Sequence, residues 1–196
     1  NTRQTLDNLF SAVDNPVELR GSVLYGSSLA LGERSYQGTN LIALVDVPDP
    51  GEIDNPPPRY YWRVRSYDTY TNGAWSTVEG ALTEPLSAQT PLVLDIDPES
   101  ETAIFTFTNK AERTVNLLMP HQSYWADIDT FATYTELPEG AHDLNLLRAT
   151  ERLRVDDLYS VRSAPLAPTI SELRAAGTEY PEWVTTRYLQ LPENLP

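Results

Sequence analysis

The chain has 196 residues, of which 40% are hydrophobic and 21% charged, so it can enclose one sizeable core and is not globally disordered. Its net charge of −14 is spread over both halves without a basic patch, which argues against nucleic-acid binding and against direct adsorption to anionic lipid. With no cysteine, it has no disulfide, no thiolate metal ligand and no cysteine nucleophile.

The first 20 residues predict a segment distinct from the rest. Leu6, Leu9, Phe10 and Val13 are spaced as on one face of a short amphipathic helix. No run in the chain reaches the roughly 20 apolar residues needed to cross a bilayer, and the start is neither an initiator Met nor a signal peptide. We therefore expect a piece of a longer protein, in which residues 1–20 follow a membrane span.

Residues 21–168 predict an all-β, sandwich-like domain of about nine short strands. Short apolar runs are bounded by turn residues, and 16 prolines against 9 glycines disfavour long helices. The runs outside the aromatic segment are 23–25, 28–31, 41–47, 92–96, 103–108, 114–119, 131–135, 144–147 and 158–161. Residues 48–58, with five prolines, predict an exposed extended loop.

An aromatic segment, residues 60–76, predicts a β-hairpin. Asn72-Gly73 suits the two central positions of a type I′ turn, and β-branched and aromatic side chains precede it. On the incoming arm Tyr60, Trp62 and Val64 share one face, which we expect to be packed into the core.

The same segment offers one candidate binding surface. If they face solvent, four of its rings could stack on sugars, as in many carbohydrate-binding modules. These residues are Tyr61, Tyr67, Tyr70 and Trp75. A carbohydrate- or cell-wall-binding module is accordingly an alternative function for the chain.

Catalytic and metal-binding signals are weak. A Ser or Thr nucleophile would need His121 or His142 as its base, and neither lies in a supporting motif, which leaves a stand-alone hydrolase as a second alternative. Residues 95–101 carry alternating carboxylates but lack the glycine and the closing glutamate of a calcium loop. Asp127 and Asp129 are typical of a polar loop. We expect no catalytic residue, no metal and no cofactor.

Residues 169–196 predict short helices and a linker. Thr169-Ile170-Ser171-Glu172 is a capping box, and Gly177 occupies the place of a helix C-terminal glycine, so a helix is expected over about residues 170–176. A second helical turn is expected after Pro181.

Several segments together resemble one protein family. They match, in order, a "YWR … YDxYxGxGW" signature, an "LFAP" strand end, a "YxVxS" strand and a "YP … YLQLP" ending. The matching residues are Tyr60-Tyr61-Trp62-Arg63 with Tyr67-Asp68-Thr69-Tyr70-Thr71-Asn72-Gly73-Ala74-Trp75-Ser76, then Leu117-Leu118-Met119-Pro120, Tyr159-Ser160-Val161-Arg162-Ser163, Tyr180-Pro181 and Tyr188-Leu189-Gln190-Leu191-Pro192. The chain resembles the extracytoplasmic region that precedes the catalytic core in bacterial membrane-anchored transglutaminase-like proteins. Ala74 departs from the signature, which has glycine there.

This resemblance implies a function for the chain as part of a larger protein. The family has amino-terminal membrane helices, this region, a core with a Cys-His-Asp triad and a final membrane helix. None of the triad can be carried over to this chain, which lacks cysteine. The expectation is a non-catalytic accessory domain outside the bacterial cell membrane that positions the core. Its expected partners are that core and, in the alternative, cell-wall glycan or peptide.

Overall fold

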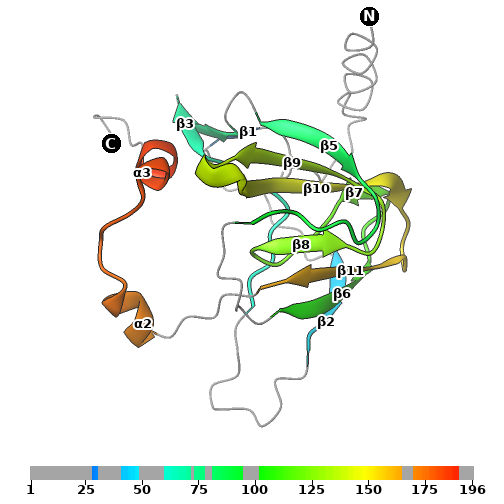
Figure 1. Cartoon of the computed structure of the whole chain (residues 1–196). Coiled ribbons are helices and arrows are strands. Elements are labelled where there is room, and N and C mark those ends of the chain that lie inside the picture. Colours follow the sequence, from blue (N-terminus) through cyan, green and yellow to red (C-terminus); the bar gives the residue numbers. More distant parts are fainter. Residues whose placement is uncertain are drawn as a thin grey trace, which may run out of the picture.

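The structure is a computed structural model that describes residues 28–30, 41–48, 60–71, 73–77, 81–94, 102–164 and 170–189 (Figure 1). Within these residues the strands form three antiparallel sheets, which confirms the all-β expectation. One sheet has the order β5-β9-β10-β7, with β5 Leu82–Leu86, β7 Thr114–Asn116, β9 Thr130–Glu136 and β10 His142–Leu153. Another has the order β2-β6-β11-β8, with β2 Ala43–Asp46, β6 Ala103–Asn109, β8 Ser123–Ala126 and β11 Leu158–Ser163. The third, β1-β4-β3, contains β1 Ser28–Ala30, β3 Thr69–Thr71 and β4 Ala74–Ser76.

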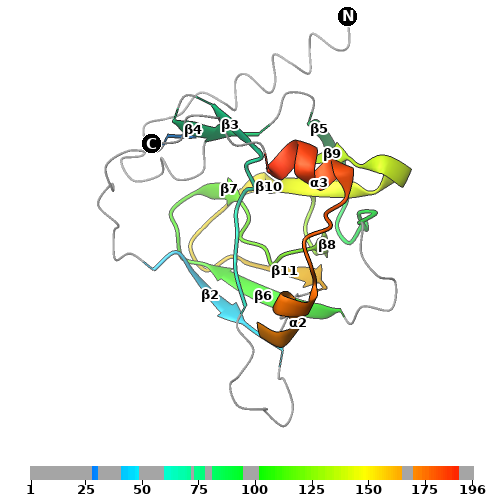
Figure 2. The same ribbon diagram turned by 90° about the vertical axis from the view of Figure 1, so that its left-hand side faces the viewer.

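The two four-stranded sheets form the layers of a sandwich with the core between them (Figure 2). Strand β6 alternates as a half-buried strand should: Phe105 and Phe107 are fully buried, whereas Ile104 is exposed. The opposite sheet contributes Ala132 and Tyr134, among others, to the same cluster. The predicted strand 103–108 is therefore confirmed by β6, and its inward face holds the centre of the core.

The aromatic segment differs from the prediction. Only β3 and β4 form the hairpin, with Gly73 at φ +77° in the turn, while Asn72 lies outside the described residues. The incoming residues cross from one sheet of the sandwich toward the other, making isolated bridges from Arg63 to Met119 and from Arg65 to Leu146 (Figure 2). The prediction of a long hairpin arm was wrong because these residues pair with residues distant in sequence.

The expected inward face of this crossing segment is confirmed. Tyr60 and Trp62 meet the Phe105 ring edge-on, at centroid distances of 5.1 and 5.3 Å, and Trp62 also meets Phe107. Val64 is buried as well. Edge-to-face rings add roughly 0.5–1.5 kcal/mol per pair to the burial of their area, so this segment is fastened by its aromatic side chains.

Three other strand predictions need correction. Strand β5 was missed because it contains Pro85, which an edge strand tolerates since its outer side needs no ladder hydrogen bond. Strand β8 was also missed, since its polar and aromatic residues do not form an apolar run. Residues 92–94 are not a strand, although Leu92 is buried and its N–H donates to the Tyr124 carbonyl at 2.8 Å. The rest of the 92–96 prediction, the strand at 23–25, the segment 1–20 and most of the 48–58 loop lie outside the described residues.

Strand β10 carries a bulge that matters for the site. Its register with β9 shifts between Leu144 and Leu146, so Asn145 is an extra residue in the strand. Residues on both faces are consequently buried here, and the strand extends well beyond the predicted 144–147. Bulges redirect the backbone groups and side chains around them.

Two short α-helices follow the sandwich, as expected. Helix α2 is Ile170–Ala175, with Gly177 at φ +72° just after it, and α3 is Glu182–Tyr188, beginning after Pro181. A single 3-10 turn, η2 at Pro138–Gly140, joins β9 to β10. Helix α3 lies beside the β9–β10 end of the sandwich in both views (Figures 1 and 2). Among the described residues, no helix is long and apolar enough to cross a membrane.

Candidate functional site

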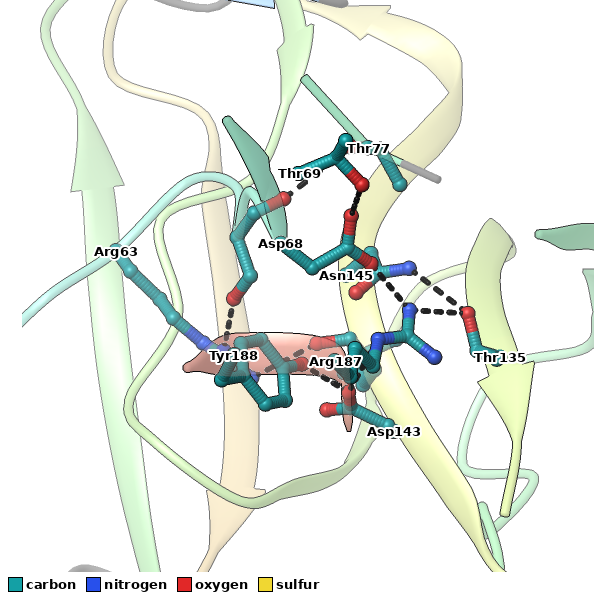
Figure 3. A network of polar contacts seen from close by, with 11 residues as sticks. Arg63, Asp68, Thr69, Thr77, Thr135, Asp143, Asn145, Arg187 and Tyr188 are labelled. Carbon is teal, nitrogen blue, oxygen red and sulfur yellow. Dashed lines mark hydrogen bonds and ion pairs between the residues drawn. The ribbon is translucent and has the colours of Figure 1, made fainter. Parts of the chain in front are cut away.

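Helix α3 is attached to the sandwich by an arginine that reaches two carboxylates (Figure 3). Arg187 Nη2 donates to Asp68 Oδ2 at 2.5 Å and also to Thr135 Oγ1, while its Nε lies 3.7 Å from Asp143 Oδ2. Asp68 comes from the residue before β3, Thr135 from β9 and Asp143 from β10. One side chain of α3 thus joins three segments of the fold.

The next residue of α3 adds a second contact to the same carboxylate. Tyr188 Oη donates a hydrogen bond to Asp143 Oδ2, and the Arg187 guanidinium lies 5.6 Å from the centre of the Tyr188 ring. Burial raises the pKa of Tyr188, and the hydrogen bond to the Asp143 carboxylate raises it further. The phenol therefore stays protonated near neutral pH and remains a donor.

The β10 bulge and the crossing segment hold Asp68 in position. Ser66 N–H donates to the Asn145 carbonyl at 2.9 Å, and Thr77 Oγ1 donates to the Ser66 carbonyl at 3.3 Å. Asp68 N–H donates to the Ser76 carbonyl at 3.0 Å, which starts the β3–β4 hairpin. Asp68 is consequently fixed by backbone hydrogen bonds on both sides of it.

The contact is largely removed from water. The side chains of Asp68 and Arg187 are 1% and 13% exposed. No residue of α3 is fully buried, although Trp183 and Val184 are half-buried. Charges at low exposure interact more strongly than surface pairs, so Arg187 and Tyr188 supply the polar part of the contact that attaches α3.

A cavity of about 120 Å³ lies next to this anchor. It is bounded by the crossing segment, the residues after Pro120, the start of β10 and helix α3. Its lining residues are Arg63, Leu94, His121, Gln122, Leu137, His142, Asp143, Leu144 and Trp183. The two histidines considered from sequence alone thus line one cavity, together with an arginine and an aromatic ring.

Arg63 has only neutral hydrogen-bond partners among the described residues. Its Nη1 donates to Ser66 Oγ and its Nη2 to the Leu144 carbonyl at 3.0 Å. Its Nε is buried with no acceptor, and no described carboxylate lies within 4.0 Å of the guanidinium. Burial lowers the pKa of Arg63, with Asp143 and Tyr188 opposing the change.

The histidines do not form a recognisable triad. Burial, and then the Arg63 charge, lower the pKa of His121, so its imidazole is neutral at pH 7. His142 stacks on Tyr134 with ring centroids 4.0 Å apart, and its buried Nδ1 has no partner among the described residues. The nearby Ser163 hydroxyl donates to the His121 carbonyl, so it is engaged with the backbone.

The four aromatic candidates do not form one cluster. Tyr61 is 76% exposed, whereas Tyr67 is half-buried, and burial raises the pKa of Tyr67. Tyr70 and Trp75 pair across the β3–β4 hairpin, with ring centroids 5.2 Å apart and planes tilted by 50°. The structure therefore brings two of the four together, half-buried rather than fully exposed.

The acidic candidates have structural partners. Asp127 Oδ1 accepts from Ser160 N–H at 2.7 Å, and Asp129 Oδ1 accepts from Ala88 N–H at 2.8 Å, as expected for polar loops. The alternating carboxylates at 95–101 lie outside the described residues. In the part of the chain that the structure describes, no group of His, Cys, Asp or Glu side chains is arranged to hold a metal ion.

Sequence reasoning did not identify the ion pair. Asp68 and Arg187 are 119 positions apart, but each lies within or next to a quoted motif: Asp68 in the aromatic signature and Arg187 directly before the Tyr188 ending. The available signal was a pair of oppositely charged residues, one in the first motif and one directly before the last.

Comparison with known proteins adds no assignment. No protein-family model matches the chain, and neither a curated protein nor a solved structure is significantly similar to it.

Proposed function

We propose that this chain is a non-catalytic accessory domain that positions a downstream transglutaminase-like core on the extracytoplasmic side of a bacterial membrane. The observation that supports the proposal is the anchored helix α3. It carries Tyr188, the first residue of the segment that resembles the lead into such a core.

The anchor is suited to setting a direction. Arg187 and Tyr188 hold the last turn of α3 against Asp68, which directly precedes β3, and Asp143, which lies in β10. A chain leaving a helix end held at two points departs with a defined orientation, whereas one leaving a free helix would sweep a wide range of angles. Orientation of a neighbouring domain is the property that this geometry provides.

The first experiment reads the gene beyond Pro196. A Cys-His-Asp core is expected there, and its absence would refute the proposal. In the longer protein, spin labels on cysteines introduced at Glu151 and in the core, with the catalytic cysteine replaced, would report the distance between the two parts. We expect a narrow distance distribution that broadens in Arg187→Met but not in the surface control Lys110→Met. Equal breadth in all three proteins would contradict the positioning role.

A hydrolase is a second candidate function because of the cavity. His121 and His142 line it together, although no serine or threonine is among its lining residues in the described part of the chain. Hydrolysis of ester or peptide substrates that is lost in both His121→Ala and His142→Ala would support this candidate. Activity that survives both substitutions in one protein would exclude these histidines as its bases.

Carbohydrate binding remains a third candidate because Tyr61 is exposed and Tyr70 and Trp75 present a pair of rings. Binding to peptidoglycan that disappears in Trp75→Ala, with the fold retained by circular dichroism, would favour it. Binding unchanged in both Trp75→Ala and Tyr61→Ala would remove the aromatic surface from consideration.

A further inference from the structure

Arg63 is a charged side chain that contacts no carboxylate among the described residues. Buried charges in proteins are normally paired, because removing an ion from water without a partner costs several kcal/mol. The Arg63 guanidinium has five N–H groups, yet among the described residues only Ser66 Oγ and the Leu144 carbonyl accept from it, and its buried Nε has no acceptor there.

The neighbouring carboxylates are already committed to α3. Asp143 Oδ2 accepts from Tyr188 and lies near Arg187, and Asp68 accepts from Arg187. Two carboxylates and Arg187 therefore form one connected group, from which Arg63 is left out at contact distance. Arg63 and Arg187 together balance the charges of Asp68 and Asp143, and Asp143 also lines the cavity. Among the described residues, however, no carboxylate contacts Arg63, so an anion in the cavity could form an ion pair with it.

The cavity that Arg63 lines restricts what this anion can be. About 120 Å³ is far below the several hundred Å³ of a drug-sized pocket, so only a group of a few non-hydrogen atoms fits. Leu94, Leu137, Leu144 and Trp183 make part of the wall apolar. This favours a singly charged group with a small apolar part over a strongly hydrated dianion such as phosphate.

We propose that this cavity binds a small carboxylate, either a free monocarboxylate or the carboxyl terminus of a peptide, through the unused N–H groups of Arg63. Arginine suits this task because its planar fork can donate two parallel hydrogen bonds to one carboxylate. The buried Nδ1 of His142, also without a partner in the described residues, provides a second polar group in the lining set. The proposal is independent of the accessory role proposed above.

The test titrates the whole chain with acetate and, as a neutral match of similar shape, acetamide. The readout is the Arg63 Nε–Hε cross-peak in ¹H–¹⁵N NMR spectra, assigned by its absence in Arg63→Gln. Acetate is expected to shift this peak saturably and acetamide to leave it in place. N-acetylglycine against its amide tests the peptide-terminus form in the same way. Equal shifts with the charged and neutral probes, or none with either, would overturn the proposal.

Calorimetry with variants localises the site. Arg63→Gln should weaken acetate binding at least about tenfold, which corresponds to the loss of one charged hydrogen bond. The control Arg152→Gln removes the same charge from an exposed position and should leave the affinity within about twofold. Should Arg63→Gln fail to fold, Leu137→Trp places a larger side chain in the cavity wall, leaves Arg63 unsubstituted and is expected to abolish binding. Binding retained in the cavity variants, lost equally in Arg152→Gln, or stronger for phosphate than for acetate would refute a carboxylate site.

Discussion

Replacing Arg187 by methionine tests whether α3 is held by charge. The substitution keeps a long side chain but removes the guanidinium that contacts Asp68 at 2.5 Å. Breaking a buried ion pair by removing one partner costs about 3–5 kcal/mol. Because 13% of the Arg187 side chain remains exposed, we expect about 3 kcal/mol, near the lower limit of that range.

The structure also sets an upper limit on this loss. If α3 detaches, water reaches Asp68, so the global free energy of unfolding cannot fall by more than the free energy that docks the helix. Urea unfolding measures the first quantity, and hydrogen exchange at the α3 amides measures the second. We expect exchange in α3 to quicken at least as much as global stability falls.

A matched control variant and a double-mutant cycle test whether the loss comes from the ion pair itself. Lys110→Met removes a pair with Asp156 whose carboxylate side chain is 67% exposed, and it should cost less than about 1 kcal/mol. Combining Arg187→Met with Asp68→Asn should cost less than the sum of the two changes, by about 2 kcal/mol of coupling. If Arg187→Met is no more destabilising than Lys110→Met, anchoring by a buried charge is wrong.

Three further predictions concern the fold and its pH dependence. Tyr159→Phe leaves the Leu118 N–H and carbonyl, which its hydroxyl bonds at 2.8 and 2.9 Å, without that partner, so urea unfolding should show a loss of about 1–3 kcal/mol. Gly73→Ala should cost about 1 kcal/mol, seen as a lower melting temperature, because the turn needs φ +77° although space for the methyl group is open. Burial and Arg63 lower the pKa of His121 below its unfolded value, so the unfolded state takes up the proton first as pH falls below about 6.5. Stability should therefore decline from pH 7.5 to 5.5, and less steeply in His121→Gln; an identical slope in both proteins would contradict this assignment.

The strands that could be predicted are those whose sequence periodicity agrees with their final environment. Strand β6 alternates because one of its faces packs against the core, and the spacing of Phe105 and Phe107 indicates that face. Strand β5 could not be found this way, since Pro85 argues against a strand unless its edge position is known. The position of a strand at the edge of a sheet depends on the assembled fold, so a short stretch of sequence does not reveal it.

The site was less predictable than the fold because tertiary structure assembles it. The predicted hairpin arm included Arg63, whereas Arg63 lies in a crossing segment and donates to the Leu144 carbonyl beside the β10 bulge. The bulge at Asn145 itself follows no local signal, because the flanking leucines suit a regular strand equally well. His121 and His142 line the same cavity because the residues after Pro120 and the start of β10 both border it.

The order of the β2-β6-β11-β8 sheet has a consequence for self-association. Among the described strands, β2 has β6 as its one neighbour, so within this part of the chain the other edge of β2 has no strand paired to it. Apolar side chains are exposed along and beside it, at Leu41, Ile42, Leu44 and Val47. Such an edge is a template for pairing with a second chain, and charge and proline are the usual protections. Asp46 lies in this strand and Pro48 follows it, so a charge and a proline of the protective kind stand at the edge, remote from the anchor and the cavity.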